Sequence, residues 1–195
     1  MDNYAFNIEL YPWARAYRYA VEGKGGIIGL SKTKERLNIF DYSDVVYYDD
    51  VIIVVLKGSE FPFAAMEDLK KKKIGIGRGG SFGDDYERAK KSGLFEVVED
   101  SGPVARLKML LKKRIDCALI SPGKYALYQT IKQDDILLRN IEEFAILPKP
   151  FKRDPNFLGF SKKMGMQGFL KKFNEAVKHG YEIGAIQKII DKYAP

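Results

Sequence analysis

The sequence predicts an α/β protein with two lobes, each built from a mixed sheet flanked by helices. Two observations lead to this prediction. Segments with helical periodicity alternate along the chain with short apolar runs typical of strands. In addition, two polar, proline-bearing passages, residues 57–62 and 147–155, bracket a self-contained series of strands and helices. We therefore expect a discontinuous lobe one, residues 1–55 and 148–195, with lobe two, residues 56–147, inserted into it.

The elements are expected in the following order. Apolar runs predict strands at 6–10, 27–30, 51–56, 74–76, 95–98, 115–120, 136–138, 144–147 and 157–160, and helical periodicity predicts helices at 13–22, 64–70, 82–91, 103–112 and 124–131. Two amphipathic helices close the chain. Phe169, Phe173 and Val177 share a face of the first, and Ile183 and Ile190 share a face of the second.

Composition excludes several classes of protein. The chain has 195 residues with 46% hydrophobic and 30% charged residues, which is ordinary globular composition. No window approaches the roughly 18 consecutive apolar residues of a membrane span, and the start of the chain carries no signal peptide. The single cysteine, Cys117, cannot form an internal disulfide. No Cys/His spacing of a metal site occurs, so we expect neither a metal nor a cofactor.

The formal net charge of +7 favours anionic ligands. The densest basic run, Lys70–Lys73, follows a helix-like stretch, where lysines are favourable at a helix C-terminus. No aromatic residues are interleaved with this run for base stacking, so we interpret it as a solvated turn and expect no nucleic-acid partner.

A glycine-rich motif, Gly75-Ile-Gly-Arg-Gly-Gly80, lies between a predicted strand and a predicted helix. It satisfies the G-x-G-x-x-G pattern of dinucleotide-binding proteins, with Glu99 where a ribose-binding acid would stand. The block offers too few strands for a dinucleotide fold, however. We favour a simpler anion site, in which backbone N–H groups of Gly79, Gly80 and Ser81 and the Ser81 hydroxyl lie at the N-terminus of helix 82–91. Ser81 as a helix N-cap is the alternative.

A second group of polar residues, Gly29-Leu-Ser-Lys-Thr-Lys-Glu-Arg36, follows strand 27–30. Ser31 and the forked guanidinium of Arg36 could hold a carboxylate at the end of this strand. Equally, Thr33 or Ser31 could cap a helix with Arg36 on its solvated face.

Short motifs recur in a fixed order along most of the chain. They include Pro12-Trp-Ala-Arg-Ala16, Gly29 to Arg36, Phe40-Asp-Tyr-Ser-Asp44, Gly79-Gly-Ser81 and Arg114-Ile-Asp-Cys-Ala118. In this order and spacing, the chain resembles the type II periplasmic solute-binding proteins of the amino-acid-binding class, bacterial extracellular solute-binding protein family 3. The resemblance implies a two-lobed clamp that is periplasmic or extracellular and delivers a small carboxylate or amino acid to the membrane subunits of an ABC transporter.

The resemblance also implies ligand-binding residues. Arg36 and Ser31 would hold the ligand carboxylate, and Gly29 and Leu30 would supply backbone contacts. From lobe two, Gly80 and Ser81 would hold the same carboxylate. The site would lie in the cleft between the lobes.

One departure from the family concerns the ligand's ammonium group. Amino-acid binders carry an aspartate at the end of the strand that corresponds to 115–120, whereas this chain has Ser121. A neutral hydroxyl cannot supply the charge. Either the ligand is a carboxylate without an α-ammonium, or another acid such as Asp49, Asp50, Asp84 or Asp85 meets the ammonium.

The second departure lies at the start of the chain, which matches the family from its second strand onward. We therefore expect a truncated lobe one, whose incomplete sheet could pair with another copy of the chain in a homo-oligomer. Trp13 and Phe82, with Tyr47 and Tyr48, are the remaining candidates for aromatic walls of the site, although such residues more often belong to the core.

Catalysis has little support in the sequence. The single histidine, His179, is interpreted as part of a helix end, and no nucleophile elbow occurs. We expect a binding protein without enzymatic activity. A sensory domain of a signalling receptor is the alternative, and a dehydratase acting on cyclohexadienyl or arogenate substrates, which shares the fold, is a further one.

Overall fold

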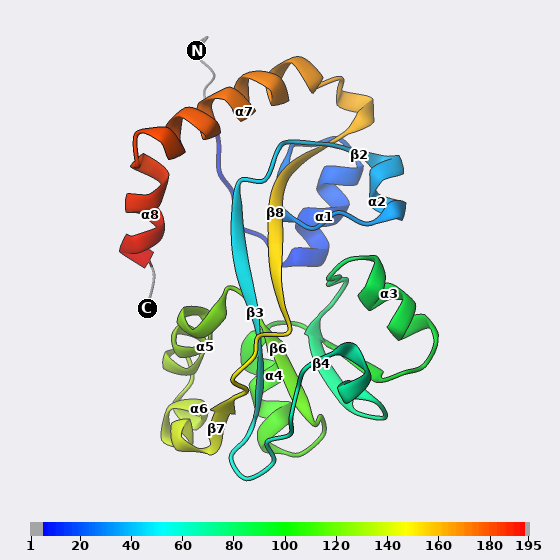
Figure 1. Ribbon diagram of the computed structural model, residues 1–195, viewed down its shortest axis with the longest axis vertical. Helices are drawn as coiled ribbons and strands as arrows, with labels where there is room; N and C mark the ends of the chain where they lie inside the picture. Colours follow the sequence, from blue (N-terminus) through cyan, green and yellow to red (C-terminus); the bar gives the residue numbers. More distant parts are fainter. Residues whose placement is uncertain (1–5, 194–195) are drawn as a thin grey trace. The chain divides into compact units, whose positions relative to one another are not determined.

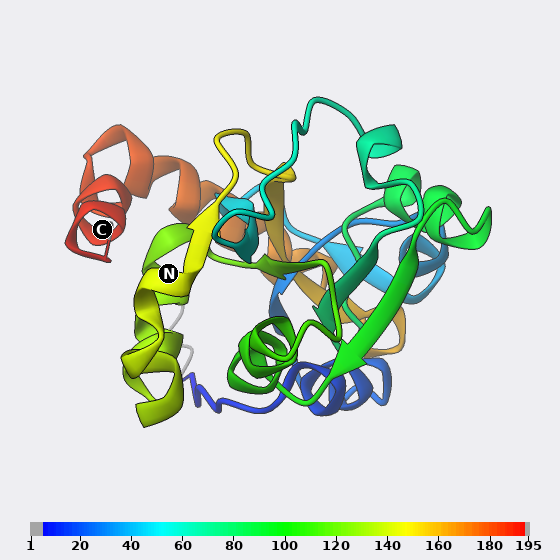
Figure 2. The same ribbon diagram turned by 90° about the horizontal axis from the view of Figure 1, so that it is seen from below.

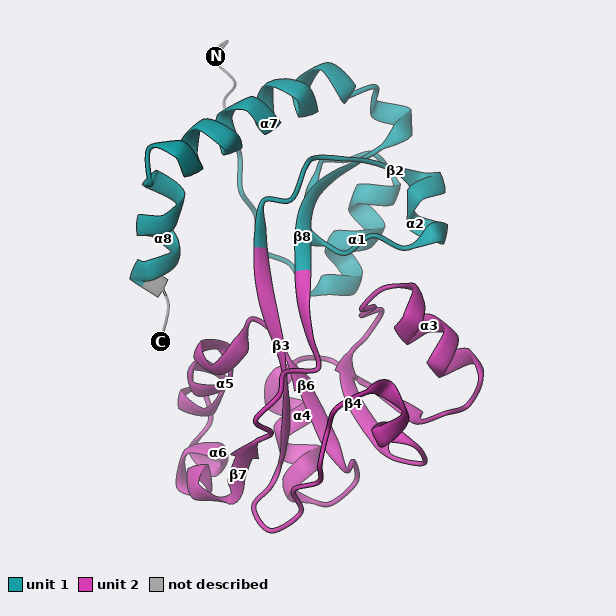
Figure 3. Ribbon diagram, in the orientation of Figure 1, with its two compact units in different colours: residues 1–47, 155–194 teal, residues 48–154, 195 magenta. Residues whose placement is uncertain are grey.

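The computed structural model describes residues 6–193 and divides the chain into two compact units (Figure 3). Unit 1 comprises the described parts of Met1–Tyr47 and Pro155–Ala194, and unit 2 comprises Tyr48–Asp154. The chain enters unit 2 within strand β3 (Tyr47–Leu56) and leaves it within strand β8 (Lys152–Ser161), where the colour changes in Figure 3. Figure 1 labels both strands. The boundaries thus lie inside two continuous strands, at 47/48 and 154/155, where we expected 55/56 and 147/148. The first precedes the polar passage 57–62, and the second falls at the end of the passage 147–155.

The remaining elements follow in chain order. They are α1 (Trp13–Val21), β1 (Ile27–Leu30), α2 (Lys34–Ile39), β2 (Phe40–Tyr42), η1 (Met66–Leu69), β4 (Lys73–Gly77), α3 (Asp84–Lys91), β5 (Glu96–Asp100), α4 (Pro103–Leu111), β6 (Cys117–Ile120), α5 (Gly123–Lys132), α6 (Asp135–Arg139), η2 (Ile141–Glu143), β7 (Phe144–Ile146), η3 (Lys162–Met164), α7 (Gln167–Glu182) and α8 (Ala185–Tyr193).

Unit 2 has three layers around a mixed sheet. Strand β3 pairs antiparallel with β7 and β6, and β4 lies parallel between β6 and β5 (Figure 2). Successive residues of β3 face opposite sides of the sheet. Val51 and Ile53 pack with Tyr86 of α3 on one side, and Ile52 and Val54 join a core formed with α4, α5 and α6 on the other. A continuous apolar run is what a strand covered on both faces requires.

Unit 1 is smaller, and the strand pairings described within it are antiparallel. Both β1 and β2 pair with β8, and α1 packs over them through Ala20 onto Ile27, Leu30 and Phe40. The mixed sheet expected for each lobe is therefore found in unit 2, whereas unit 1 departs from it. The expected strand 6–10, which could have added a further pairing, is not formed.

Residues 6–10 alternate apolar and polar side chains, but they are irregular in the structure, and the prediction of a strand is wrong. Phe6, Ile8 and Leu10 are 68%, 85% and 95% exposed. Alternation alone does not make a strand, because its backbone N–H and C=O groups need a neighbouring strand to pair with. The homo-oligomer through this sheet stays a prediction.

A second strand prediction, 136–138, is also wrong, because Ile136–Leu138 lie in the helix α6. Asp134 accepts hydrogen bonds from the N–H groups of Ile136 (3.1 Å) and Leu137 (3.3 Å) and thereby caps the helix. A short apolar run does not distinguish the two structures, and here the cap decides. The helix expected at 64–70 is only the 3₁₀ turn η1.

None of the helices within residues 6–193 is long and apolar enough to cross a membrane. The same residues contain no group of three or more His, Cys, Asp or Glu side chains that could hold a metal ion. Burial raises the pKa of the Cys117 thiol to about 12, so this cysteine is an unreactive core residue.

Candidate ligand-binding site

The predicted residues of unit 2 gather at one edge of its sheet. Strands β4 and β6 are parallel, with Ile74 opposite Cys117 and Gly75 opposite Ala118. Their carboxyl ends therefore lie side by side, so the loop after β4, residues 78–83, and Ser121 after β6 share this edge. Ligands bind at such edges in open α/β sheets, where loops supply the contacting groups.

The first two glycines of the motif, Gly75 and Gly77, lie within β4 and make room for neighbouring side chains. A Cβ added to Gly75 would lie 2.5 Å from Cδ1 of Ile115 and 3.0 Å from Cγ of Arg106, and one added to Gly77 would lie 3.0 Å from Nη2 of Arg106. Their spacing thus reflects packing, and not the close approach of a dinucleotide. Glu99 lies near the loop itself, where it accepts from the Gly79 N–H at 3.4 Å.

Arg106 stabilises this edge of the unit 2 sheet. Its side chain is buried and forms a two-pronged ion pair with Asp100, through Nε to Oδ2 at 2.7 Å and Nη2 to Oδ1 at 3.1 Å. A third bond runs from Nη1 to the carbonyl of Leu119 in β6. The Asp100 carbonyl accepts from the Arg78 N–H at 3.1 Å, at the start of the loop. One arginine therefore ties the ends of β5 and β6 together beside the loop.

The loop and the helix after it differ from the prediction. Helix α3 begins at Asp84, with Gly83 as its N-cap residue, and not at Phe82 with Ser81 as the cap. The first turn carries the acids Asp84, Asp85 and Glu87, which complement the positive end of the helix dipole. Consequently the backbone of the loop, and not the helix terminus, is the candidate for anion binding at Gly80 and Ser81. The Gly80 N–H itself donates to Gly77 O at 2.9 Å.

Ser121 lies beside an aspartate that comes from a different strand. Its exposed hydroxyl donates to Oδ2 of Asp49 in β3 at 3.4 Å. Of the four acids considered as substitutes for the missing family aspartate, Asp49 therefore contacts the position concerned. Asp84 and Asp85 belong to the first turn of α3 instead.

In unit 1 the structure brings Arg36 and Ser31 together. Thr33 is the N-cap of α2, because its Oγ1 accepts from the Arg36 N–H at 3.1 Å. The guanidinium is buried, with 6% of the residue exposed, so the alternative of a solvated arginine is wrong. Nη1 donates to Ser31 O at 3.2 Å, and the guanidinium lies over the ring of Tyr17, 5.1 Å from its centroid.

Two residues beside this cluster were not singled out from the sequence. The Tyr42 hydroxyl donates to the backbone carbonyl of Ser31 at 3.5 Å. Burial raises the pKa of the Tyr42 phenol well above its usual value, and the nearby Arg36 charge opposes this shift. The Lys32 ammonium lies 3.9 Å from the ring centroid of Phe157, and burial lowers its pKa, against an opposing effect of Asp44. Nothing in their spacing along the sequence indicated either neighbour.

Among the other predicted residues, Gly29 has a left-handed backbone conformation, whereas Leu30, Trp13 and Phe82 pack in the cores of the two units. Gly29 has a φ of +83°, so its backbone conformation favours glycine, whereas an added Cβ would meet the hydroxyl of Tyr47 only at an ordinary contact distance of 3.5 Å. Leu30 is fully buried in the core of unit 1, and half-buried Trp13 packs against the same core. The Phe82 ring contacts Tyr86 and Phe151 edge-on, with centroids 5.1 and 5.6 Å away, and so belongs to an aromatic cluster of unit 2.

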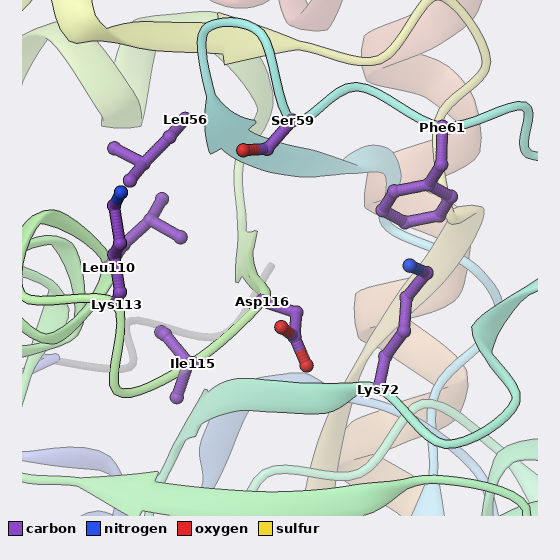
Figure 4. Close-up of a pocket in the computed structure, with 8 residues that line it drawn as sticks. All are labelled: Leu56, Ser59, Phe61, Lys72, Leu110, Lys113, Ile115 and Asp116. Carbon is purple, nitrogen blue, oxygen red and sulfur yellow. The ribbon is translucent and has the colours of Figure 1, made fainter.

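A pocket of about 260 Å³ lies at the opposite edge of the unit 2 sheet, near the amino ends of β4 and β6 (Figure 4). Lys72, Lys113 and Asp116 line it together with the Phe61 ring, over which the Lys72 ammonium lies at 3.9 Å. None of the predicted site residues contributes to this pocket.

Fold and sequence together define a solute-binding class of protein. The chain belongs to the bacterial extracellular solute-binding proteins, family 3, whose family model matches residues 3–195. This confirms the resemblance found in the sequence. The members of this family are solute-binding proteins, periplasmic or extracellular, and structural neighbours have the type II periplasmic-binding-protein fold.

Several relatives are similar to the chain at low identity. The L-cystine-binding protein TcyJ of Escherichia coli strain K12 is 24% identical over 159 residues, 82% of this chain and 55% of the relative. The chain thus spans about half the length of the curated relatives that it matches. An ancestral arginine-binding protein bound to arginine superposes with a TM-score of 0.74 at 23% identity, covering 96% of this chain and 79% of the other. A histidine kinase sensor domain with similarity to periplasmic binding proteins reaches 0.73 at 19% identity, covering 94% and 75%.

Proposed function

We propose that this chain captures a small α-amino acid, or a closely related organic acid, outside the cytoplasm and delivers it to an ABC importer, without chemical turnover. Family membership over residues 3–195 supports the solute-binding role. Relatives named for binding cystine and arginine support an amino acid as the ligand. We assign the ligand-binding groups to both units.

The ligand's carboxylate is assigned to Arg36, Ser31 and the loop at Gly80 and Ser81. A buried guanidinium presents planar, paired N–H donors that match a carboxylate, and the contacts of Arg36 with Ser31 O and the Tyr17 ring orient it. Gly29 and Leu30 would add backbone groups beside it.

The observation that carries the choice of an α-amino acid is the carboxylate of Asp49 beside Ser121. An ammonium group in a desolvated site needs a compensating negative charge, and leaving it unpaired costs several kcal/mol. Asp49 supplies such a charge next to the position where the family carries its aspartate. We therefore favour an α-amino acid over a carboxylate that lacks an ammonium group.

A thermal-shift panel tests this proposal directly. It comprises the common α-amino acids, L-cystine, their N-acetyl derivatives and simple dicarboxylates. A ligand at 100 times its Kd stabilises the protein by about 2.7 kcal/mol. We expect at least one free amino acid to stabilise the chain while its N-acetyl derivative, which lacks the ammonium, does not. Stabilisation by dicarboxylates alone would contradict the assignment to Asp49, and no stabilisation by any compound would contradict the proposed function.

The Asp49 assignment has its own test, in which titration calorimetry measures the affinity for the best amino acid of the panel. Asp49→Asn should lower the affinity at least tenfold, because the amide lacks the charge. Asp50→Asn, a change at the neighbouring exposed carboxylate, is the matched control. The exchange Asp49→Ser with Ser121→Asp should restore much of the lost affinity. An unchanged affinity in Asp49→Asn would dismiss the assignment.

Two further measurements separate the alternatives. The bound solute should be recovered chemically unchanged, as mass spectrometry of the released ligand will show, whereas a dehydratase would convert it. The structurally similar histidine kinase sensor domain indicates that this fold also occurs in sensors. Stimulation of ATP hydrolysis by an importer, and not of kinase autophosphorylation, is the result expected for transport.

A further inference from the structure

Lys152 connects strand β8 to the loop that precedes α3. Its ammonium donates a hydrogen bond to the backbone carbonyl of Phe82 at 2.8 Å and forms an ion pair with Oδ1 of Asp154 at 2.7 Å. All three residues belong to unit 2. The Asp154 side chain is only 7% exposed, so this ion pair is largely shielded from water.

The loop is shaped around this ammonium. Gly83, the residue after Phe82, has a φ of +98°, and a Cβ added there would lie 3.0 Å from Nζ of Lys152. Both the conformation and the space therefore favour glycine. The lysine head reaches the loop where the chain turns into α3, so its bond to the Phe82 carbonyl orients the peptide between the loop and the helix.

The loop is fastened at both ends. At its start, the Arg78 N–H donates to Asp100 O and the Gly80 N–H to Gly77 O. At its end, Lys152 holds the Phe82 carbonyl. Ser81 lies between these two attachments, and Gly80, the other residue assigned to the carboxylate, is itself held through its N–H. A backbone donor must be held in position to recognise an oxyanion well, because a freely moving loop would have to be ordered on binding.

We propose that Lys152 is a positioning residue for ligand recognition. It fixes the loop of residues 78–83 so that backbone groups of this loop face the solute's carboxylate. This inference rests on the proposed function for its ligand but not for its geometry. Lys152 acts through the backbone and not through net charge, because Asp154 neutralises its ammonium.

Three variants separate position from charge and from folding. Lys152→Met removes the hydrogen bond to the Phe82 carbonyl and also the ion pair with the buried Asp154 carboxylate. Loss of a buried ion-pair partner destabilises the fold by itself. Lys152→Met with Asp154→Asn removes the bond and keeps the charge balanced. Lys152→Arg keeps a cation that can still donate to the carbonyl. Lys149→Met is the matched control, because the Lys149 ammonium also donates to a backbone carbonyl of unit 2, that of Ala64.

The first readout is the set of backbone amide resonances and hydrogen-exchange rates of Gly79, Gly80 and Ser81, measured without ligand. We expect the double variant to shift these resonances and to speed exchange, Lys152→Arg to retain most of the native values, and Lys149→Met to leave them unchanged. Native values in a folded double variant would overturn the proposal.

The second readout is calorimetric affinity for the best amino acid of the thermal-shift panel. We expect the double variant to lose about tenfold and Lys152→Arg to lose less, with Lys149→Met unchanged. A displaced loop with undiminished affinity would overturn the role in recognition. Should the unmodified protein bind no compound of the panel, the proposed function fails, and the amide resonances alone decide whether Lys152 positions the loop.

Discussion

Two buried arginines, one in each unit, show how differently the same side chain can be held. Arg106 in unit 2 is 8% exposed, and Asp100 pairs with it through both carboxylate oxygens. Arg36 in unit 1 is 6% exposed, donates to a neutral backbone carbonyl and lies over an aromatic ring. The two carboxylate oxygens of Asp100 neutralise the Arg106 guanidinium, whereas the Ser31 carbonyl and the Tyr17 ring orient the Arg36 guanidinium. We interpret Arg106 as structural, and we interpret Arg36, which we assign to the ligand carboxylate, as an anion anchor.

The largest effect should follow from breaking the neutralised pair. Asp100→Ala leaves the Arg106 guanidinium buried without its counter-charge, and such changes cost about 3–5 kcal/mol of folding free energy. Urea unfolding monitored by circular dichroism measures the loss. Asp135→Ala, at an acid near the start of α6, serves as the control. A loss below about 1 kcal/mol for Asp100→Ala would show that the pair is not a brace.

The second-largest loss of stability is expected at Gly75, which packs against Arg106. Gly75→Ala places a methyl group 2.5 Å from Cδ1 of Ile115 and 3.0 Å from Cγ of Arg106, so the core must shift. Overpacking of this kind costs about 1–3 kcal/mol. Gly102→Ala is the control, because an added Cβ there meets nothing within 4 Å and its φ of 161° is that of extended backbone. Gly93→Ala would not serve, because Gly93 has a positive φ that strains an alanine. Equal stability of the two alanine variants in urea would contradict the packing explanation for the motif.

Arg36 should affect binding more than folding. Arg36→Lys keeps the charge but loses the planar pair of donors, so we expect the affinity for the bound amino acid to fall more than tenfold, which is about 1.4 kcal/mol or more. Calorimetry measures the affinity, and urea unfolding should show a smaller change. Glu35→Gln on the same helix is the control. Unchanged affinity in Arg36→Ala would remove Arg36 from the site.

The smallest of these effects concerns the helix that carries Arg36. Thr33→Ala removes the side chain that caps α2, which should cost about 1 kcal/mol of stability. Thr33→Ser keeps the hydroxyl and should retain most of it. If the cap positions Arg36, the ligand affinity of Thr33→Ala should fall modestly as well, and an affinity equal to that of the unmodified protein would limit Thr33 to a capping role.

Much of the fold could be predicted from local sequence patterns. The helices α3, α4 and α5 of unit 2 and the strands expected at 51–56, 74–76 and 115–120 follow from periodicity. Apolar residues on both faces of a strand, or on one face of a helix, leave few alternatives. The ordered motifs along nearly the whole chain predicted the family, and the match over residues 3–195 confirms it. The helices and strands are determined by short stretches of consecutive residues, and the family by the order and spacing of short motifs along the chain.

Tertiary structure decided the rest. The alternation in 6–10 predicted a strand, but a strand exists only where a partner offers backbone groups. Gly75 and Gly77 matched a dinucleotide-binding motif, but in the structure the Arg106 side chain packs against β4 where these two residues lack a side chain. Asp49 beside Ser121, and Lys152 at the Phe82 carbonyl, join residues about 70 positions apart. Such contacts depend on which strands become neighbours, which the sheet as a whole fixes and no short stretch of sequence encodes.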